Sequence, residues 1–139
     1  MSWIIFAILS AIFAALVAIF GKIGIQNIDS VLGTTLRSFV MFSFLAATSI
    51  FLGKANLFST IDKKALFYII LSGVAGAISW LFYFFALKGG PVSSVAAIDR
   101  LSVVFVVILA FLFLGEKLTG QSILGAALLI IGAILLTLK

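Results

Sequence analysis

Five apolar runs, each close to the length of a membrane-spanning helix, dominate this chain of 139 residues. They lie at 3–21, 30–52, 65–87, 92–114 and 121–138. A helix of about 20 apolar residues crosses the roughly 30 Å hydrocarbon core of a bilayer. Any other spanning backbone would leave peptide groups unpaired in lipid, and five strands could not close a barrel. The sequence therefore predicts an all-α, polytopic transmembrane bundle of five helices, forming a single domain over 1–139.

The composition agrees with a lipid environment. The chain is 65% hydrophobic and 9% charged, whereas soluble domains are about half apolar and a quarter charged. Only Met1 and Ser2 precede the first run, so it lacks the basic start of a signal peptide and is expected to be a retained span. The links between runs are too short to fold as domains. We expect a multi-pass protein of the inner or plasma membrane whose function lies within the bundle.

Several classes of function are disfavoured by what the sequence lacks. It has no cysteine and no histidine, which removes disulfides, thiol chemistry and the commonest metal ligands. It has no Gly-x-Ser-x-Gly elbow, so an enzyme is not expected, nor is a metal or a cofactor. The net charge is +5, but the basic residues stand mostly singly at the ends of apolar runs. This pattern indicates contact with lipid headgroups rather than with nucleic acid.

Three charged residues fall inside the predicted spans: Arg37, Asp99 and Arg100. A charge near the bilayer centre costs about 2.5–3.5 kcal/mol on insertion scales, so it usually faces a partner or a wet cavity. Arg37 and Asp99 each lie seven residues beyond the start of a span, which places both roughly 10 Å deep on the same side. Two interpretations remain open. The charges line a substrate cavity, or Arg37 and Asp99 form a structural bridge while Arg100 and Lys22 snorkel to the headgroups.

Lys22, Trp80 and Tyr83 are expected on that same side of the membrane. Trp80 and Tyr83 are three residues apart and so share a helix face. They suit an interfacial aromatic belt and equally a stacking surface for a planar or cationic substrate. The predicted binding or gating residues are Lys22, Arg37, Trp80, Tyr83, Asp99 and Arg100.

Small residues mark expected helix contacts, because they let backbones approach closely. Gly73 and Gly76 lie in the third span, and Gly125 and Gly132 in the fifth. Either pair could serve packing within the chain or a dimer seam, and the seam is favoured for the fifth span.

An odd number of spans places the two termini on opposite sides of the membrane. Loops on one side carry Lys54, Lys63, Lys64 and Lys117, and the other side carries Lys22, Lys88 and Lys139. Loop lysines and arginines set orientation, and here they nearly balance. A single orientation with the amino terminus inside and insertion in both orientations both remain open.

Several runs together resemble a known family. They are Phe20-Gly21-Lys22-Ile23-Gly24, Thr35-Leu36-Arg37-Ser38, Ser79-Trp80-Leu81-Phe82-Tyr83, Ile98-Asp99-Arg100-Leu101-Ser102 and Leu114-Gly115-Glu116-Lys117-Leu118-Thr119. The chain resembles the EamA-like domain of the drug/metabolite transporter superfamily, in its short five-span bacterial and archaeal form. That resemblance covers essentially the whole chain.

The resemblance implies a fold and a function. The chain looks like one half of a ten-helix inverted-repeat transporter, so an antiparallel homodimer with dual topology is implied. The implied function is secondary transport of a small metabolite or amphipathic solute by alternating access. The similar small multidrug transporters have an acid in the first span; this chain has none there, so any proton coupling would use Asp99. The alternative function is a non-transporting structural or assembly subunit of a membrane complex.

Overall fold

The computed structural model describes residues 2–138, in which helices alternate with short links and no strand occurs. Five helices in this range are long and apolar enough to cross a membrane: Trp3–Gly24, Ser30–Phe51, Lys63–Gly89, Val92–Leu114 and Gly120–Thr137. The predicted all-α class with five spans is confirmed. The largest differences in extent are in the first span, which continues to Gly24, and in the third, which is longer at both ends.

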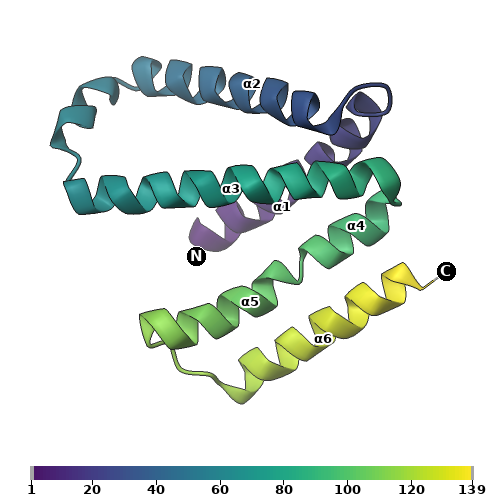
Figure 1. Ribbon diagram of the computed structural model, residues 1–139. Helices are drawn as coiled ribbons and strands as arrows, with labels where there is room; N and C mark the ends of the chain where they lie inside the picture. The colour runs from purple at the N-terminus through teal and green to yellow at the C-terminus, as the bar shows by residue number, and fades with distance from the viewer. Residues whose placement is uncertain (1, 139) are drawn as a thin grey trace. The chain divides into compact units, whose positions relative to one another are not determined.

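The helical elements follow one another along the chain as shown in Figure 1. They are α1 Ser2–Gly24, α2 Ser30–Phe51, the 3₁₀ helix η1 Ala55–Thr60, α3 Lys63–Gly89, α4 Val92–Asp99, α5 Ser102–Leu109, the π-helix η2 Ala110–Leu114 and α6 Gly120–Thr137. The chain divides into two compact units. One is Gly21–Lys88, called the hairpin unit below, and the other, the terminal unit, comprises 1–20 and 89–139.

In the hairpin unit, α2 and α3 run in opposite directions and are joined through η1 (Figure 1). The start of α2 is set by its cap. Asp29 Oδ1 accepts hydrogen bonds from the backbone N–H groups of Val31 at 2.8 Å and Leu32 at 3.1 Å. An aspartate at this position satisfies donors that the first turn of a helix leaves unpaired. The polar residues before Ser30 therefore supply the cap, and the apolar run after it continues as the helix.

Five hydroxyl groups along α2 bind carbonyls of the preceding turn, those of Thr34, Thr35, Ser38, Ser43 and Thr48. Thr34 donates to the Ser30 carbonyl at 2.7 Å, and Ser38 donates to the Thr34 carbonyl at 2.9 Å. Thr48 donates to the Phe44 carbonyl at 2.8 Å. Bonds of this kind to the preceding turn let serine and threonine lie in a membrane span without a partner on another helix. Arg37 is then the one side chain of α2 that carries a charge into the span.

Close packing joins the start of α2 to the link before it. Ile25 is buried there, and the Gly33 backbone lies against it. A Cβ atom added at Gly33 would lie 3.2 Å from Ile25 Cγ2 and 3.3 Å from Ile28 Cδ1. Both distances are tighter than ordinary van der Waals contact. The absence of a side chain at Gly33 therefore lets the chain turn back this closely.

In the terminal unit, α6 runs back alongside both α4 and α5 (Figure 1). Ser94 Oγ on α4 donates to the Leu136 carbonyl on α6 at 2.9 Å. Ala110 and Ala133 are buried. Gly115 ends η2 with a φ of +68°, a left-handed conformation that costs glycine little.

The fourth span is interrupted between α4 and α5. The N–H of Leu101 donates to the Ile98 carbonyl at 2.9 Å, that of Val103 to Arg100 at 3.1 Å, and that of Val104 to Leu101 at 2.9 Å. These bonds reach back three residues, as in a 3₁₀ turn, instead of the four of an α-helix. The sequence predicts a span over 92–114 but does not indicate this interruption, which falls at Asp99 and Arg100.

Candidate functional site

The intramembrane arginine of the hairpin unit lies on the face of a tryptophan. Arg37 Cζ is 3.6 Å from the centroid of the Trp80 ring. Arg37 is seven residues beyond the start of α2, and Trp80 is nine residues before the end of α3. At 1.5 Å per residue these positions lie about 10 and 14 Å from the helix ends. The contact between the two side chains therefore lies inside the two spans.

Two more aromatic rings complete this cluster. Trp80 and Tyr83 pack edge to face, with ring centroids 5.4 Å apart and planes at 81°. Phe84 lies 6.3 Å from Trp80, and its ring centroid is 5.8 Å from Arg37 Cζ. Residues three and four apart share a helix face, which explains why Trp80, Tyr83 and Phe84 gather. The four residues Arg37, Trp80, Tyr83 and Phe84 are called the Arg37 cluster below.

Phe84 was not among the predicted site residues. Its exposed fraction is only 3%, and it touches both the arginine and the tryptophan. The spacing of four residues from Trp80 was the available sequence signal. That spacing alone could not distinguish a site residue from a packing residue.

Lysines at the carboxyl end of α3 bind backbone carbonyls. Lys22 Nζ donates to the Leu87 carbonyl and, at 3.4 Å, to that of Lys88. Lys88 Nζ donates to the Ile28 carbonyl at 2.8 Å. A cation here pairs with carbonyls that the last turn leaves open and complements the helix dipole. Lys22 thus lies in the same unit as the Arg37 cluster, about two helical turns along α3 from Trp80.

Neither carboxylate of the hairpin unit pairs with Arg37. Asp29 and Asp62 are the only acids in residues 21–88, all of which the structure describes. Asp29 caps α2, and Asp62 Oδ2 accepts from the Lys64 N–H at 3.2 Å at the start of α3. Asp29 is eight residues before Arg37, about 12 Å along the helix. Within its unit, the arginine is stacked but not neutralised.

The remaining predicted charges, Asp99 and Arg100, belong to the terminal unit. Both lie at the interruption of the fourth span; Asp99 is half-buried and Arg100 is exposed. An Arg37–Asp99 pair would join the two units, and it stays a prediction.

The predicted packing glycines also stay predictions. Apart from the adjoining residues and backbone of the same helix, no described atom of the same unit lies within 4 Å of a Cβ atom built at Gly73 or Gly76 on α3, or at Gly125 or Gly132 on α6. The glycine-bearing faces of α3 and α6 are therefore not covered at these positions by other residues of the same unit.

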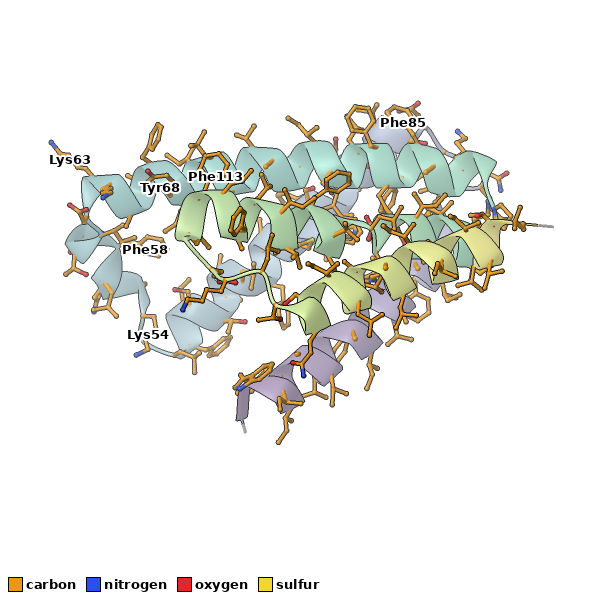
Figure 2. The ribbon with its side chains drawn as sticks, turned by 90° about the horizontal axis from the view of Figure 1, so that it is seen from below. Lys54, Phe58, Lys63, Tyr68, Phe85 and Phe113 are labelled. Carbon is orange, nitrogen blue, oxygen red and sulfur yellow. The ribbon has the colours of Figure 1, made fainter. Side chains whose placement is uncertain are left out.

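Exposed aromatic and basic side chains lie along the hairpin unit. Tyr68 and Phe85 project from α3, and Lys54 and Lys63 flank η1 (Figure 2). Lys54 and Lys63 are thus at the end of the hairpin unit away from Lys22 and Lys88, so both ends are basic. In the terminal unit, an apolar groove of about 300 Å³ lies between α5 and α6. Its lining has no ionisable side chain, so it suits hydrocarbon and not a charged solute.

Comparisons with known proteins agree over most of the chain. The EamA-like transporter family matches residues 1–138. A Sinorhizobium protein named "Uncharacterized transporter in cobO 3'region" is 44% identical over 135 residues, which are 97% of this chain and 96% of that protein. A Methanocaldococcus jannaschii protein, named only as uncharacterized, is 38% identical over 78 residues, 56% of this chain and 57% of its own. No solved structure matches the chain.

Proposed function

The chain belongs to the EamA-like transporter family, and from this premise we propose that two copies of it, in opposite orientations, form a secondary carrier. The carrier moves a small metabolite or amphipathic solute across the inner or plasma membrane by alternating access. Each copy supplies one half of the solute pathway. Proton coupling, where it occurs, uses Asp99.

The observation that carries the proposal is the stacking of Arg37 on Trp80, with Cζ 3.6 Å from the ring centroid, inside α2 and α3. A charge at this depth is costly to insert and is usually retained for a role in binding or transport. The start of α2 is capped by Asp29, and five of its hydroxyls bind its own backbone, so Arg37 is not required for either. A binding role accounts for the arginine and for the rings around it.

The number of spans supports pairing in opposite orientations. Carriers built from inverted repeats place their solute site between two halves of opposite topology. Five spans per chain make one such half, and a second copy must enter the membrane the other way to complete it. Basic residues at both ends of the hairpin unit favour neither orientation strongly.

The test is solute flux into liposomes that contain only the purified protein. Amino acids, amines, sugars and organic anions are offered with an imposed proton gradient, and liposomes without protein set the background. We expect saturable uptake of one of these classes. Asp99→Asn should abolish gradient-driven accumulation but not membrane insertion, because it removes the carboxylate inside the fourth span.

Asp62→Asn is the matched control, since it removes a carboxylate outside the spans, and it should retain accumulation. Full accumulation with Asp99→Asn would contradict the coupling role. Absence of flux for every class would contradict the carrier and favour the alternative, an assembly subunit of a membrane complex.

A further inference from the structure

Arg37 is a permanent positive charge that its own unit leaves without a counter-ion. A guanidinium stays protonated in proteins, and both carboxylates of the hairpin unit are at helix starts. We propose that the Arg37 cluster binds an oxyanion of the transported solute, with a carboxylate as the preferred group. This inference rests on the carrier function proposed above and names the class of its substrate.

The stacked geometry leaves the right donors open. At 3.6 Å from the ring centroid, the guanidinium lies nearly parallel to the Trp80 ring, because an edge-on guanidinium could not bring its central carbon so close. One face of the guanidinium is then against Trp80, while its N–H groups point outward in its own plane. Those N–H groups form the fork that matches a carboxylate with two parallel hydrogen bonds.

The aromatic rings hold this fork in place. Trp80 packs edge to face against Tyr83 at 5.4 Å and against Phe84 at 6.3 Å. An arginine oriented before the ligand arrives loses less side-chain freedom on binding. The rings therefore position the donor and exclude water from one of its faces.

The same contact disfavours a cationic solute. Trp80 is the strongest kind of aromatic acceptor for a cation, and Arg37 already covers one of its faces. An organic cation would also be repelled by the arginine charge in a medium of low dielectric constant. Removing the arginine should therefore uncover a cation site on the same tryptophan.

Binding can be followed on Trp80 alone. The chain has two tryptophans, so Trp3→Phe leaves Trp80 as the only one. This protein is placed in nanodiscs of zwitterionic lipid at constant chloride ionic strength and titrated with acetate, succinate, inorganic phosphate and tetramethylammonium. We expect saturable changes in Trp80 fluorescence with acetate and succinate and no saturable change with tetramethylammonium.

Arg37→Gln in the same background should weaken carboxylate binding about tenfold to a hundredfold, the effect of losing a hydrogen bond to a charged group. It should also produce a saturable response to tetramethylammonium. Arg37→Lys keeps the charge without the planar fork and should bind carboxylates more weakly than the parent. Lys54→Gln removes a positive charge outside the spans and should match the parent. Circular dichroism checks that each variant keeps its helix content.

Each other outcome would overturn the inference. These outcomes are a saturable fluorescence change with tetramethylammonium in the parent, and unchanged carboxylate affinity with Arg37→Gln. A third is the absence of any fluorescence change with an anion, which would leave Asp99 as the partner of Arg37. A lipid phosphate has the same oxyanion chemistry, so nanodiscs with anionic lipid form a separate arm. A fluorescence change with anionic lipid but not with soluble carboxylates would assign the site to a headgroup and overturn the solute site.

Flux measured in parallel separates this inference from the carrier proposal. Flux of a cation without carboxylate binding would overturn the inference and leave the carrier intact. Carboxylate binding without flux of any solute would keep the site and overturn the carrier.

Discussion

Lys88 reaches from the end of α3 to the Ile28 carbonyl at 2.8 Å, while Lys22 donates to the last carbonyls of α3. Together these bonds fasten the link between α1 and α2 to the end of α3. Arg37, by contrast, has a ring and no backbone carbonyl as its described neighbour in this unit. The basic residues Lys22, Lys88 and Arg37 of the hairpin unit therefore differ in their contacts. The lysines bind backbone carbonyls, whereas the arginine is stacked on Trp80, where its donors are open to the proposed oxyanion.

Substitution of Gly33 tests how closely the link between α1 and α2 packs against the start of α2. Gly33→Ala should destabilise the protein by about 1–3 kcal/mol, the usual cost of overpacking. The added methyl group would meet Ile25 at 3.2 Å and Ile28 at 3.3 Å. The measurement is the free energy of unfolding in a denaturing-detergent titration followed by circular dichroism.

Gly24→Ala is the matched control, because apart from the adjoining residues and backbone of α1 no described atom of the hairpin unit lies within 4 Å of a Cβ atom built there. It should change the free energy of unfolding by less than Gly33→Ala. Equal effects of the two substitutions would contradict the close packing of Gly33.

At the scale of elements, the interruption between α4 and α5 is the least regular part of the spans. Its hydrogen bonds reach back three residues over Ile98–Val104, which is weaker geometry than that of an α-helix. An interrupted helix bends more easily than a continuous one. In many carriers, such interruptions lie beside the groups that bind the coupling ion. Asp99 and Arg100 lie at this break.

Hydrogen exchange should detect the interruption. In nanodiscs, backbone amides of 101–104 should exchange faster than amides in the middle of α6, which belongs to the same unit and serves as the internal control. The reason is that hydrogen bonds reaching back three residues have poorer geometry in general than those of an α-helix, so this segment should open locally at lower free energy. Equal protection of the two segments would mean that the fourth span is one continuous helix.

The sequence was sufficient to predict the five spans but not the interruption of the fourth span or the side-chain contacts between helices. The lengths of the apolar runs predict five membrane spans, and five are found. Asp29 marks the start of α2, because its side chain caps that helix. No proline or glycine lies at the break after Asp99, so the residue pattern did not predict it. The helix periodicity placed Trp80 and Tyr83 together.

The contact of Arg37 with Trp80 could not be predicted from the sequence, for a different reason. Depth in the membrane made Asp99 a candidate, but which side chain covers a given helix face depends on how two helices pack. The contact with Trp80 required the placement of α2 against α3.

At the scale of the whole molecule, the proposed carrier requires two copies of this chain in opposite orientations, in place of the two halves of an inverted-repeat carrier. The topology predicted from the sequence places Lys54, Lys63, Lys64 and Lys117 on one side of the membrane and Lys22, Lys88 and Lys139 on the other, a near balance. The positive-inside rule then gives neither orientation a strong advantage. A population of both orientations is the condition for an antiparallel pair.

The most direct measurement of this claim is the location of the carboxyl terminus in cells. The chain is fused there to alkaline phosphatase, which is active only outside the cytoplasm, or to green fluorescent protein, which fluoresces only inside. We expect both fusions to be active at comparable levels. Asn56→Lys, which adds a positive charge to the link between α2 and α3, should shift the population toward one orientation. Activity of only one reporter in the unaltered chain would contradict the paired, inverted carrier.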